Sequence, residues 1–200
     1  SGHESLGVTF AYDPTGRRIA KTVTENGTTK TENYCHDRDN LWTGLLTESG
    51  TRETVRYLYT ERVDQAIARH DSENGVQWYL PNRLGSVSQE ANPLGEIVQA
   101  ADYTAFGEDR DHGNGALDER LGFVARELDR ETSFSFFRNR YYVPSLGRFA
   151  TEDPTRFLYG ELLLYGYAIN GPDVLIDPFG LAAAEENNSL ISRVAIRLKS

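Results

Sequence analysis

The chain has 200 residues and a formal net charge of −9, from 30 acidic and 21 basic side chains. This balance argues against a nucleic-acid partner, because such binding depends on neutralising phosphates. A single cysteine, Cys35, excludes an internal disulfide and a cysteine-rich metal site, and the four histidines share no ligand spacing. These residues give no reason to expect a metal or another cofactor. No apolar run reaches the roughly 20 residues of a membrane span, so we expect no membrane span either.

Short runs rich in Val, Ile, Thr, Tyr and Phe alternate with turn sequences along the chain. The runs lie at 17–25, 54–60, 76–80 and 96–106. Asn-Gly, the strongest short hairpin signal, occurs in 25–28 and 73–76. Other turn sequences lie at 48–51, 92–96, 113–115, 129–132 and 144–148. Short strands at regular spacing with turns between them predict an all-β fold, a meander of short antiparallel strands.

Two segments near the C-terminus have helical patterns. Residues 159–170 predict a short turn of helix. Residues 188–200 predict a short C-terminal helix with an apolar face, capped by Asn188 or Ser189. Because the basic face of this helix is weak, we interpret it as a docking helix or a frayed end rather than a membrane-binding helix.

A loose repeat occupies the first fifty residues. Tyr12-Asp13 is followed by Gly16-Arg17, and about 22 residues later Tyr34 is followed by Asp37 and Leu41. A period in the twenties predicts an array of hairpins in which each unit pairs only with its neighbours. Such an array has an open edge unless another element caps it.

Five segments together resemble one family. "YDPTGRRIAK" (12–21) resembles the YD repeat of RHS-repeat and YD-repeat proteins. The segments 59–69 and 78–108 resemble the start of the RHS repeat-associated core domain, 121–154 its centre and 165–181 its end. The joint occurrence of "RYYVPSLGRFATEDP" and "IDPFGL" makes the resemblance specific.

The resemblance implies a fold and a set of partners. In this family, YD repeats form a spiral β-shell, and the core domain closes one end and curls inward as a plug. The shell encloses a variable C-terminal polypeptide, often a toxin, in insecticidal Tc complexes, bacterial polymorphic toxins and, more remotely, teneurins. We expect YD-repeat hairpins at 1–65, the core and plug at 66–181, and a tail at 182–200. The implied partners are an upstream shell of the same chain and a C-terminal toxin or cargo. The implied location is bacterial, as a secreted, surface-exposed or secretion-system-delivered protein, and the lack of Met suggests a piece of a longer chain.

The resemblance also implies self-cleavage after Leu181, at the Leu181–Ala182 bond. Its catalytic residues match Asp153, Asp177 and Arg140. By their residue type alone, both aspartates are turn formers, since each precedes a proline. Two nearby carboxylates can nevertheless divide the roles of base and acid, because they cannot both ionise cheaply. Neither role can be assigned to one aspartate from the sequence.

The other residues of "DPFGL" (177–181) are expected to form the substrate. Phe179 and Leu181 are expected to fit an apolar pocket, Pro178 belongs to the turn, and Gly180 permits a close backbone approach. The reaction would be intramolecular and single-turnover, so positioning supplies much of its rate.

Arg140 is expected on one strand of "FSFFRNRYYV", on the face of Phe136, Arg138 and Tyr142. Its guanidinium can keep a carboxylate ionised or stabilise an oxyanion, and Arg138 could take its place. An ordinary cross-strand ion pair is the competing interpretation. The chain departs from the family pattern at Pro81 and Arg83, where relatives carry His and Asp, so no role is transferred to them.

Three functions therefore compete. The first is a shell-closing core that cleaves itself by an aspartyl-protease-like mechanism. The second is a non-cleaving structural or adhesive surface module. The third, a free-standing hydrolase acting in trans, has no Ser-His pair, metal cluster or phosphate loop in its favour.

Overall fold

The computed structural model describes residues 6–38, 40–48, 51–110, 120–155, 163–181 and 183, without the side chains of 45–48 and 51–53. The chain forms two compact units, residues 1–79 with 92–95 and residues 80–91 with 96–200. The division expected from the family, with boundaries at 65 and 181, stays a prediction. Among the described residues, no helix is long and apolar enough to span a membrane.

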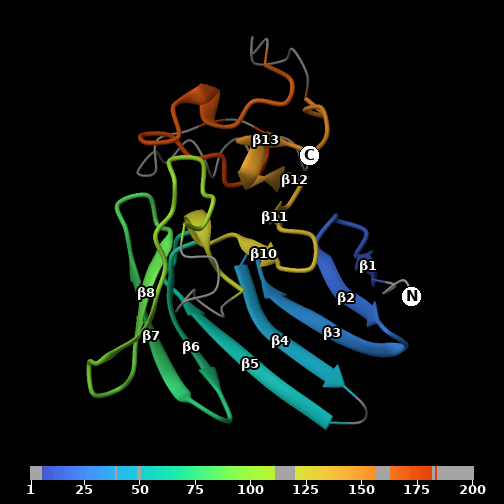
Figure 1. The fold of residues 1–200 in the computed structure, drawn as a ribbon, viewed down its shortest axis with the longest axis vertical. Coiled ribbons are helices and arrows are strands. Elements are labelled where there is room, and N and C mark those ends of the chain that lie inside the picture. Colours follow the sequence, from blue (N-terminus) through green and yellow to red (C-terminus); the bar gives the residue numbers. More distant parts are fainter. Residues whose placement is uncertain are drawn as a thin grey trace. The chain divides into compact units, whose positions relative to one another are not determined.

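The strands of the first unit follow one another in chain order (Figure 1). Each is antiparallel to the next, so the expected meander is confirmed. These strands are β1 (Leu6–Tyr12), β2 (Arg18–Glu25), β3 (Thr28–Asp37), β4 (Asn40–Glu48), β5 (Thr51–Tyr59), β6 (Ala66–Asp71) and β7 (Gly75–Pro81).

The Asn-Gly signals both mark hairpins, with different turns. Asn26 and Gly27 form the two-residue turn between β2 and β3, and both have positive φ (50° and 82°), as a type I′ turn requires. The turn between β6 and β7 is longer, since Asp71 pairs with Gly75 and three residues lie between them. The Asp71 side chain accepts the backbone N–H groups of Glu73 and Asn74 within this turn. The middle of the turn expected at 48–51 and the whole turn expected at 113–115 lie outside the described residues.

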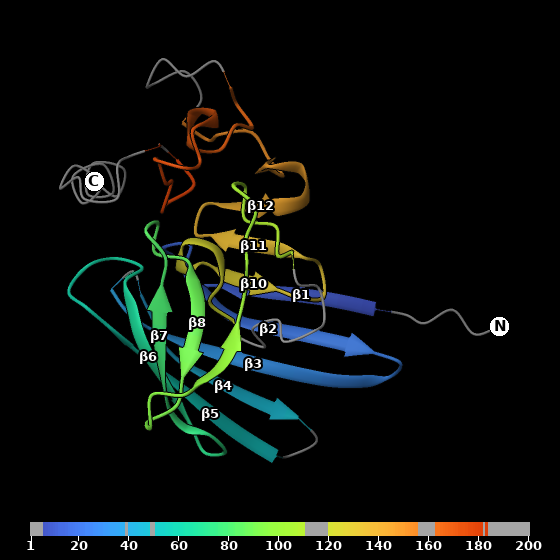
Figure 2. The ribbon, with the colours of Figure 1, turned by 60° about the vertical axis from the view of Figure 1, so that its left-hand side comes forward.

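The second unit contains two antiparallel groups of strands. β8 (Val87–Ala91) pairs with β9 (Ile97–Ala100). β10 (Glu127–Asp129), β11 (Phe134–Phe137), β12 (Arg140–Val143) and β13 (Arg148–Phe149) form a small meander, most of which Figure 2 shows. Three short 3-10 turns accompany them: η1 (Phe123–Ala125) precedes β10, η2 (Pro144–Leu146) joins β12 to β13, and η4 (Ala168–Asn170) follows β13.

The helical expectations are met only in small part. The described portion of 159–170 is a turn that ends in η4, and the rest of that range lies outside the described residues. The expected helix at 188–200 lies wholly outside them.

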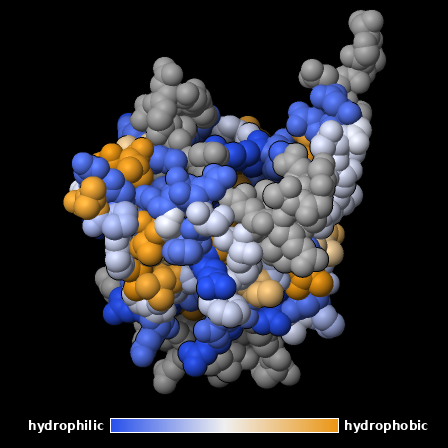
Figure 3. Space-filling view, turned by 90° about the horizontal axis from the view of Figure 1, so that it is seen from below, coloured by the Kyte–Doolittle hydropathy of each residue, from blue (hydrophilic) through white to orange (hydrophobic). Residues whose placement is uncertain are grey.

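Aromatic rings dominate the core of the second unit. Phe137, Tyr142, Phe149 and Tyr167 have no exposed surface, and their ring centroids lie 4.8–6.0 Å apart. Such tilted and edge-on ring pairs add to the hydrophobic effect of burial. Large exposed apolar side chains also occur, and on the face shown in Figure 3 hydrophobic residues are interspersed with hydrophilic ones.

One five-residue turn recurs four times. It begins with Asp13, Asn82, Asn92 or Thr104, whose side-chain oxygen accepts a backbone N–H from within the turn. Its fourth residue is always a glycine with φ between 80° and 83°, and this glycine donates its N–H to the first carbonyl. Only glycine adopts this φ without a steric penalty, so the pattern explains these Gly positions.

η4 is unusual because its three residues are all left-handed. Ala168, Ile169 and Asn170 have φ of 49°, 51° and 57°. A left-handed backbone costs an L-residue about 1–2 kcal/mol, and asparagine tolerates it better than a β-branched residue does. Ile169, which is 55% exposed, contributes strain without core packing.

A first prediction compares two glycines of the recurring turn. A Cβ at Gly107 would lie 2.3 Å from the Phe123 ring, whereas a Cβ at Gly85 would meet nothing within 4 Å. Gly85→Ala should lower the free energy of unfolding by about 1–2 kcal/mol through φ alone. Gly107→Ala should cost about 1–3 kcal/mol more, because the ring must move. Equal losses in chemical denaturation would contradict this packing argument.

A second prediction concerns the strain in η4. Ile169→Asn should raise the free energy of unfolding by about 1 kcal/mol, because asparagine accepts a left-handed backbone. Val174→Asn is the control, since Val174 is 54% exposed and has no positive φ. Thermal unfolding of both variants tests the idea, which is wrong if Ile169→Asn is no more stable than Val174→Asn.

Candidate functional site

The hairpin of β11 and β12 is the centre of the candidate site. Phe137 pairs directly with Arg140, so Arg138 and Asn139 form the turn between the strands. The expectation of one continuous strand is therefore wrong: the chain reverses at Arg138, which has a positive φ of 59°. Arg140 shares its buried face with Phe137 and Tyr142, not with Phe136.

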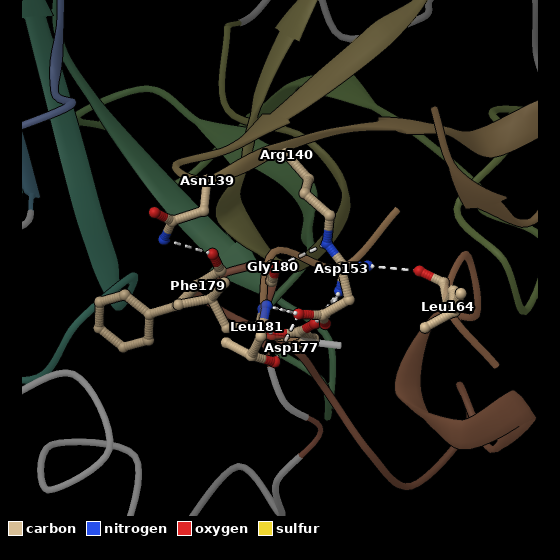
Figure 4. Close-up of polar contacts among 9 residues, drawn as sticks. Asn139, Arg140, Asp153, Leu164, Asp177, Phe179, Gly180 and Leu181 are labelled. Carbon is tan, nitrogen blue, oxygen red and sulfur yellow. Dashed lines mark hydrogen bonds and ion pairs between the residues drawn. The ribbon is translucent and has the colours of Figure 1, made fainter. Parts of the chain in front are cut away.

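Three neighbouring side chains of this hairpin contact three consecutive carbonyls of the motif 177–181. Arg138 Nη1 donates to the Pro178 carbonyl at 2.5 Å. Asn139 Nδ2 donates to the Phe179 carbonyl at 2.9 Å, and Arg140 Nε donates to the Gly180 carbonyl at 2.5 Å (Figure 4). The motif backbone is thus bound residue by residue.

Arg140 also joins the two aspartates. Its Nη2 atom lies 2.9 Å from Asp153 Oδ2 and 3.3 Å from Asp177 Oδ2 (Figure 4). Its Nη1 atom donates to the Leu164 carbonyl at 3.1 Å. Two carboxyl groups that were predicted together from positions 24 residues apart therefore face one nitrogen atom.

The other carboxylate oxygens have donors as well. Asp153 Oδ1 accepts the Thr155 N–H at 2.7 Å and the Thr155 hydroxyl at 2.5 Å. Asp177 Oδ1 accepts the Leu181 N–H at 2.9 Å. Both aspartates are thus turn formers, and both are also partners of Arg140.

The site is buried and has an aromatic floor. The side chains of Arg140, Asp153 and Asp177 are 2–9% exposed, and the Arg140 guanidinium lies 3.7 Å from the Phe149 ring centroid. Burial strengthens these electrostatic contacts, because little water screens them. Burial likewise raises the pKa of Tyr167 well above its usual value, and the nearby Tyr142 and the negative charge of Asp177 add to this shift.

Two side chains of the motif are largely buried. Phe179 and Leu181 are only 7% and 8% exposed. The Arg138 guanidinium lies 4.9 Å from the Phe179 ring centroid, within range of a cation–π contact. Gly180 has φ of 65°, and a Cβ there would lie 2.8 Å from the Phe137 carbonyl oxygen. Ala182, the other side of the expected scissile bond, lies outside the described residues.

Some functional contacts were missed at the level of sequence. Asn139 and Thr155 bind the site but were not predicted to do so. Thr155 had a signal, because Asp-Pro-Thr also occurs at 13–15, where Asp13 Oδ1 accepts the same two Thr15 donors. Arg83 donates to the Asp173 carbonyl, which ties it to the segment leading into the motif. Arg138 does not replace Arg140 but binds a different carbonyl.

No group of three His, Cys, Asp or Glu side chains within the described part of the chain is arranged to bind a metal ion. The site itself offers two carboxyl groups and a guanidinium. These groups can move a proton and stabilise a negative charge next to the backbone of Leu181.

Curated relatives cover most of this chain. The chain is 29% identical over 198 residues to the double-stranded DNA deaminase toxin A of Burkholderia cenocepacia, and 88% of the chain is covered. It is 30% identical over 185 residues to the tRNA3(Ser)-specific nuclease WapA of Bacillus spizizenii, with 90% covered. The chain spans only 14% and 8% of the length of these two relatives.

The fold and the family agree with these relatives. The crystal structure of TcdB2-TccC3 has a similar fold, with a TM-score of 0.70 at 22% identity over 87% of this chain and 9% of that one. The family model for the Teneurin YD-shell matches residues 1–168. The chain therefore belongs to the YD-shell family of RHS and YD-repeat proteins.

Proposed function

We propose that this chain is a shell-closing RHS core that cleaves itself after Leu181, with Asp153, Asp177 and Arg140 as the catalytic residues. The observation that carries the proposal is the shared Arg140 Nη2 atom, which lies within 3.3 Å of both carboxylates. The Leu181 amide bound to Asp177 brings the expected scissile residue to the same point. Reactive groups held together in this way need little further ordering to react.

The proposed reaction is a hydrolysis with two proton transfers. One carboxylate takes a proton from water as the water oxygen bonds to the Leu181 carbonyl carbon. The other carboxyl group, protonated, donates its proton to the Ala182 nitrogen as the carbon–nitrogen bond breaks. The two carboxyl groups face one Arg140 nitrogen and are therefore placed to divide the roles of base and acid. Arg140 stabilises the negative charge that develops during the attack.

A purely structural role is the alternative, and one observation favours it. Every carboxylate oxygen of the pair already accepts a hydrogen bond or an ion pair from the protein. Such a saturated pair can also serve only to anchor the motif. A non-cleaving structural or adhesive module would use the same contacts.

The wider setting of the chain follows from its relatives. We propose that an upstream YD-repeat shell of the same chain and a C-terminal cargo of the toxin class are its partners. Two of the relatives are named as a deaminase toxin and a tRNA nuclease, and the chain matches only a small part of each. A secreted or delivered location follows from the same likeness.

A third prediction tests self-cleavage. In the chain with a small folded protein fused after Ser200, mass spectrometry should find a fragment that ends at Leu181. Asp153→Asn and Asp177→Asn should each abolish this fragment, because each removes one proton-transferring group. Asp173→Asn is the matched control, since the exposed Asp173 lies four residues before Asp177 and uses only its carbonyl. If the wild-type mass stays intact over several days and a range of pH values, the proposal is wrong and the structural alternative is favoured.

A fourth prediction tests the close approach at Gly180. Gly180→Ala should slow cleavage at least about 100-fold, because the new Cβ pushes the motif away from the Phe137 carbonyl and misplaces the reacting bond. Gly85→Ala has a similar backbone penalty but lies outside the motif and should cleave at the wild-type rate. If Gly180→Ala cleaves as fast as Gly85→Ala does, the close approach has no part in the reaction.

A further inference from the structure

The contacts between the β11–β12 turn and the motif have a fixed register. Positions 138, 139 and 140 bind carbonyls 178, 179 and 180, so each donor lies 40 residues before its acceptor. Arg138 adds a second contact, over the Phe179 ring. A shift of the motif by one residue would pair each donor with a different carbonyl and would move the Phe179 ring away from Arg138.

We propose that Arg138 and Asn139 are positioning residues that fix which peptide bond of the motif reaches the aspartates. This inference rests on the proposed self-cleavage. Arg138 and Asn139 bind the Pro178 and Phe179 carbonyls, so they can act through the motif backbone. The carbonyl that follows the bound series belongs to Leu181, the residue whose N–H lies on Asp177.

The geometry supports a positioning role. Arg138 and Asn139 lie in a turn, so their side chains are not needed for the strand pairing of β11 with β12. Asn139 is exposed, and Arg138 is partly buried, so neither is a core residue. The three donors can hold the motif backbone whatever its side chains are. Gly180 and the buried Phe179 side chain can restrict its sequence.

The first test uses cleavage in the fused chain. Asn139→Asp replaces the donor by an oxygen that repels the Phe179 carbonyl, and it should slow cleavage by about 10- to 100-fold. At pH values where the introduced carboxyl group is ionised, the pH dependence of the rate should keep the wild-type shape, because the proton-transferring groups are unchanged. Asn170→Asp is the matched control, with the same change of charge at an exposed site outside the motif, and should cleave normally.

Arg138 offers a conservative rescue. Arg138→Ala should slow cleavage, and Arg138→Lys should recover part of the rate, because an ammonium group can still donate to the Pro178 carbonyl and lie over the Phe179 ring. Equal rates for the alanine and lysine variants would argue against the proposed contact. A wild-type rate in Asn139→Asp would overturn the positioning role of Asn139.

A second measurement separates this inference from the cleavage itself. Hydrogen exchange at the amides of Gly180 and Leu181 can be compared in an Asp153→Asn background, which prevents cleavage. Asn139→Asp should speed exchange there by about tenfold, with an unchanged midpoint of global unfolding, whereas Asn170→Asp should have no effect. If the wild type never cleaves, the proposed function fails. Hydrogen exchange alone then tests whether Arg138 and Asn139 fix the position of the motif. Unchanged exchange in Asn139→Asp would show that the turn does not fix the motif.

Discussion

The buried guanidinium of Arg140 is the interaction on which the second unit depends. It binds the Gly180 and Leu164 carbonyls, faces two carboxylates and lies over the Phe149 ring. These partners come from three parts of the chain: residues 149–153, Leu164 and the motif 177–181. A buried charge is costly by itself, and loss of one partner from a buried ion pair costs about 3–5 kcal/mol. The guanidinium therefore makes these segments converge, because separation would leave charged groups buried and unpaired.

The contacts that anchor the motif 177–181 would also serve the proposed cleavage. Asp153 forms a turn with Thr155, and Asp177 forms one with Leu181, so local hydrogen bonds help to orient each carboxylate that faces Arg140. The aromatic core beneath them keeps water away, which raises the strength of every charge interaction above it. Structural anchoring and proton transfer thus make compatible demands on these residues, and only a measured cleavage separates them.

Sequence reasoning succeeded where the signal was local or carried by a specific motif. The meander followed from turn residues and two-residue periodicity, and the confirmed Asn26-Gly27 turn is an example. Asp153, Asp177 and Arg140 were predicted together through the family resemblance, and the structure does bring them together. It failed at Arg138 and Asn139, because "FSFFRNRYYV" has no glycine or proline to mark the reversal. The positive φ of Arg138 is favoured by contacts with residues 40 positions away, which no local pattern records.

By itself, the sequence determined the class of fold, the position of most turns and the identity of the charged groups. These properties depend on neighbours within a few residues, where backbone sterics and side-chain capping act directly. Only the tertiary structure decided which atoms those groups contact: one nitrogen for two carboxylates, and three consecutive donors for three consecutive carbonyls. Such contacts join distant segments, and their geometry is set by the packing of the aromatic core and the register of the β11–β12 hairpin rather than by local preference.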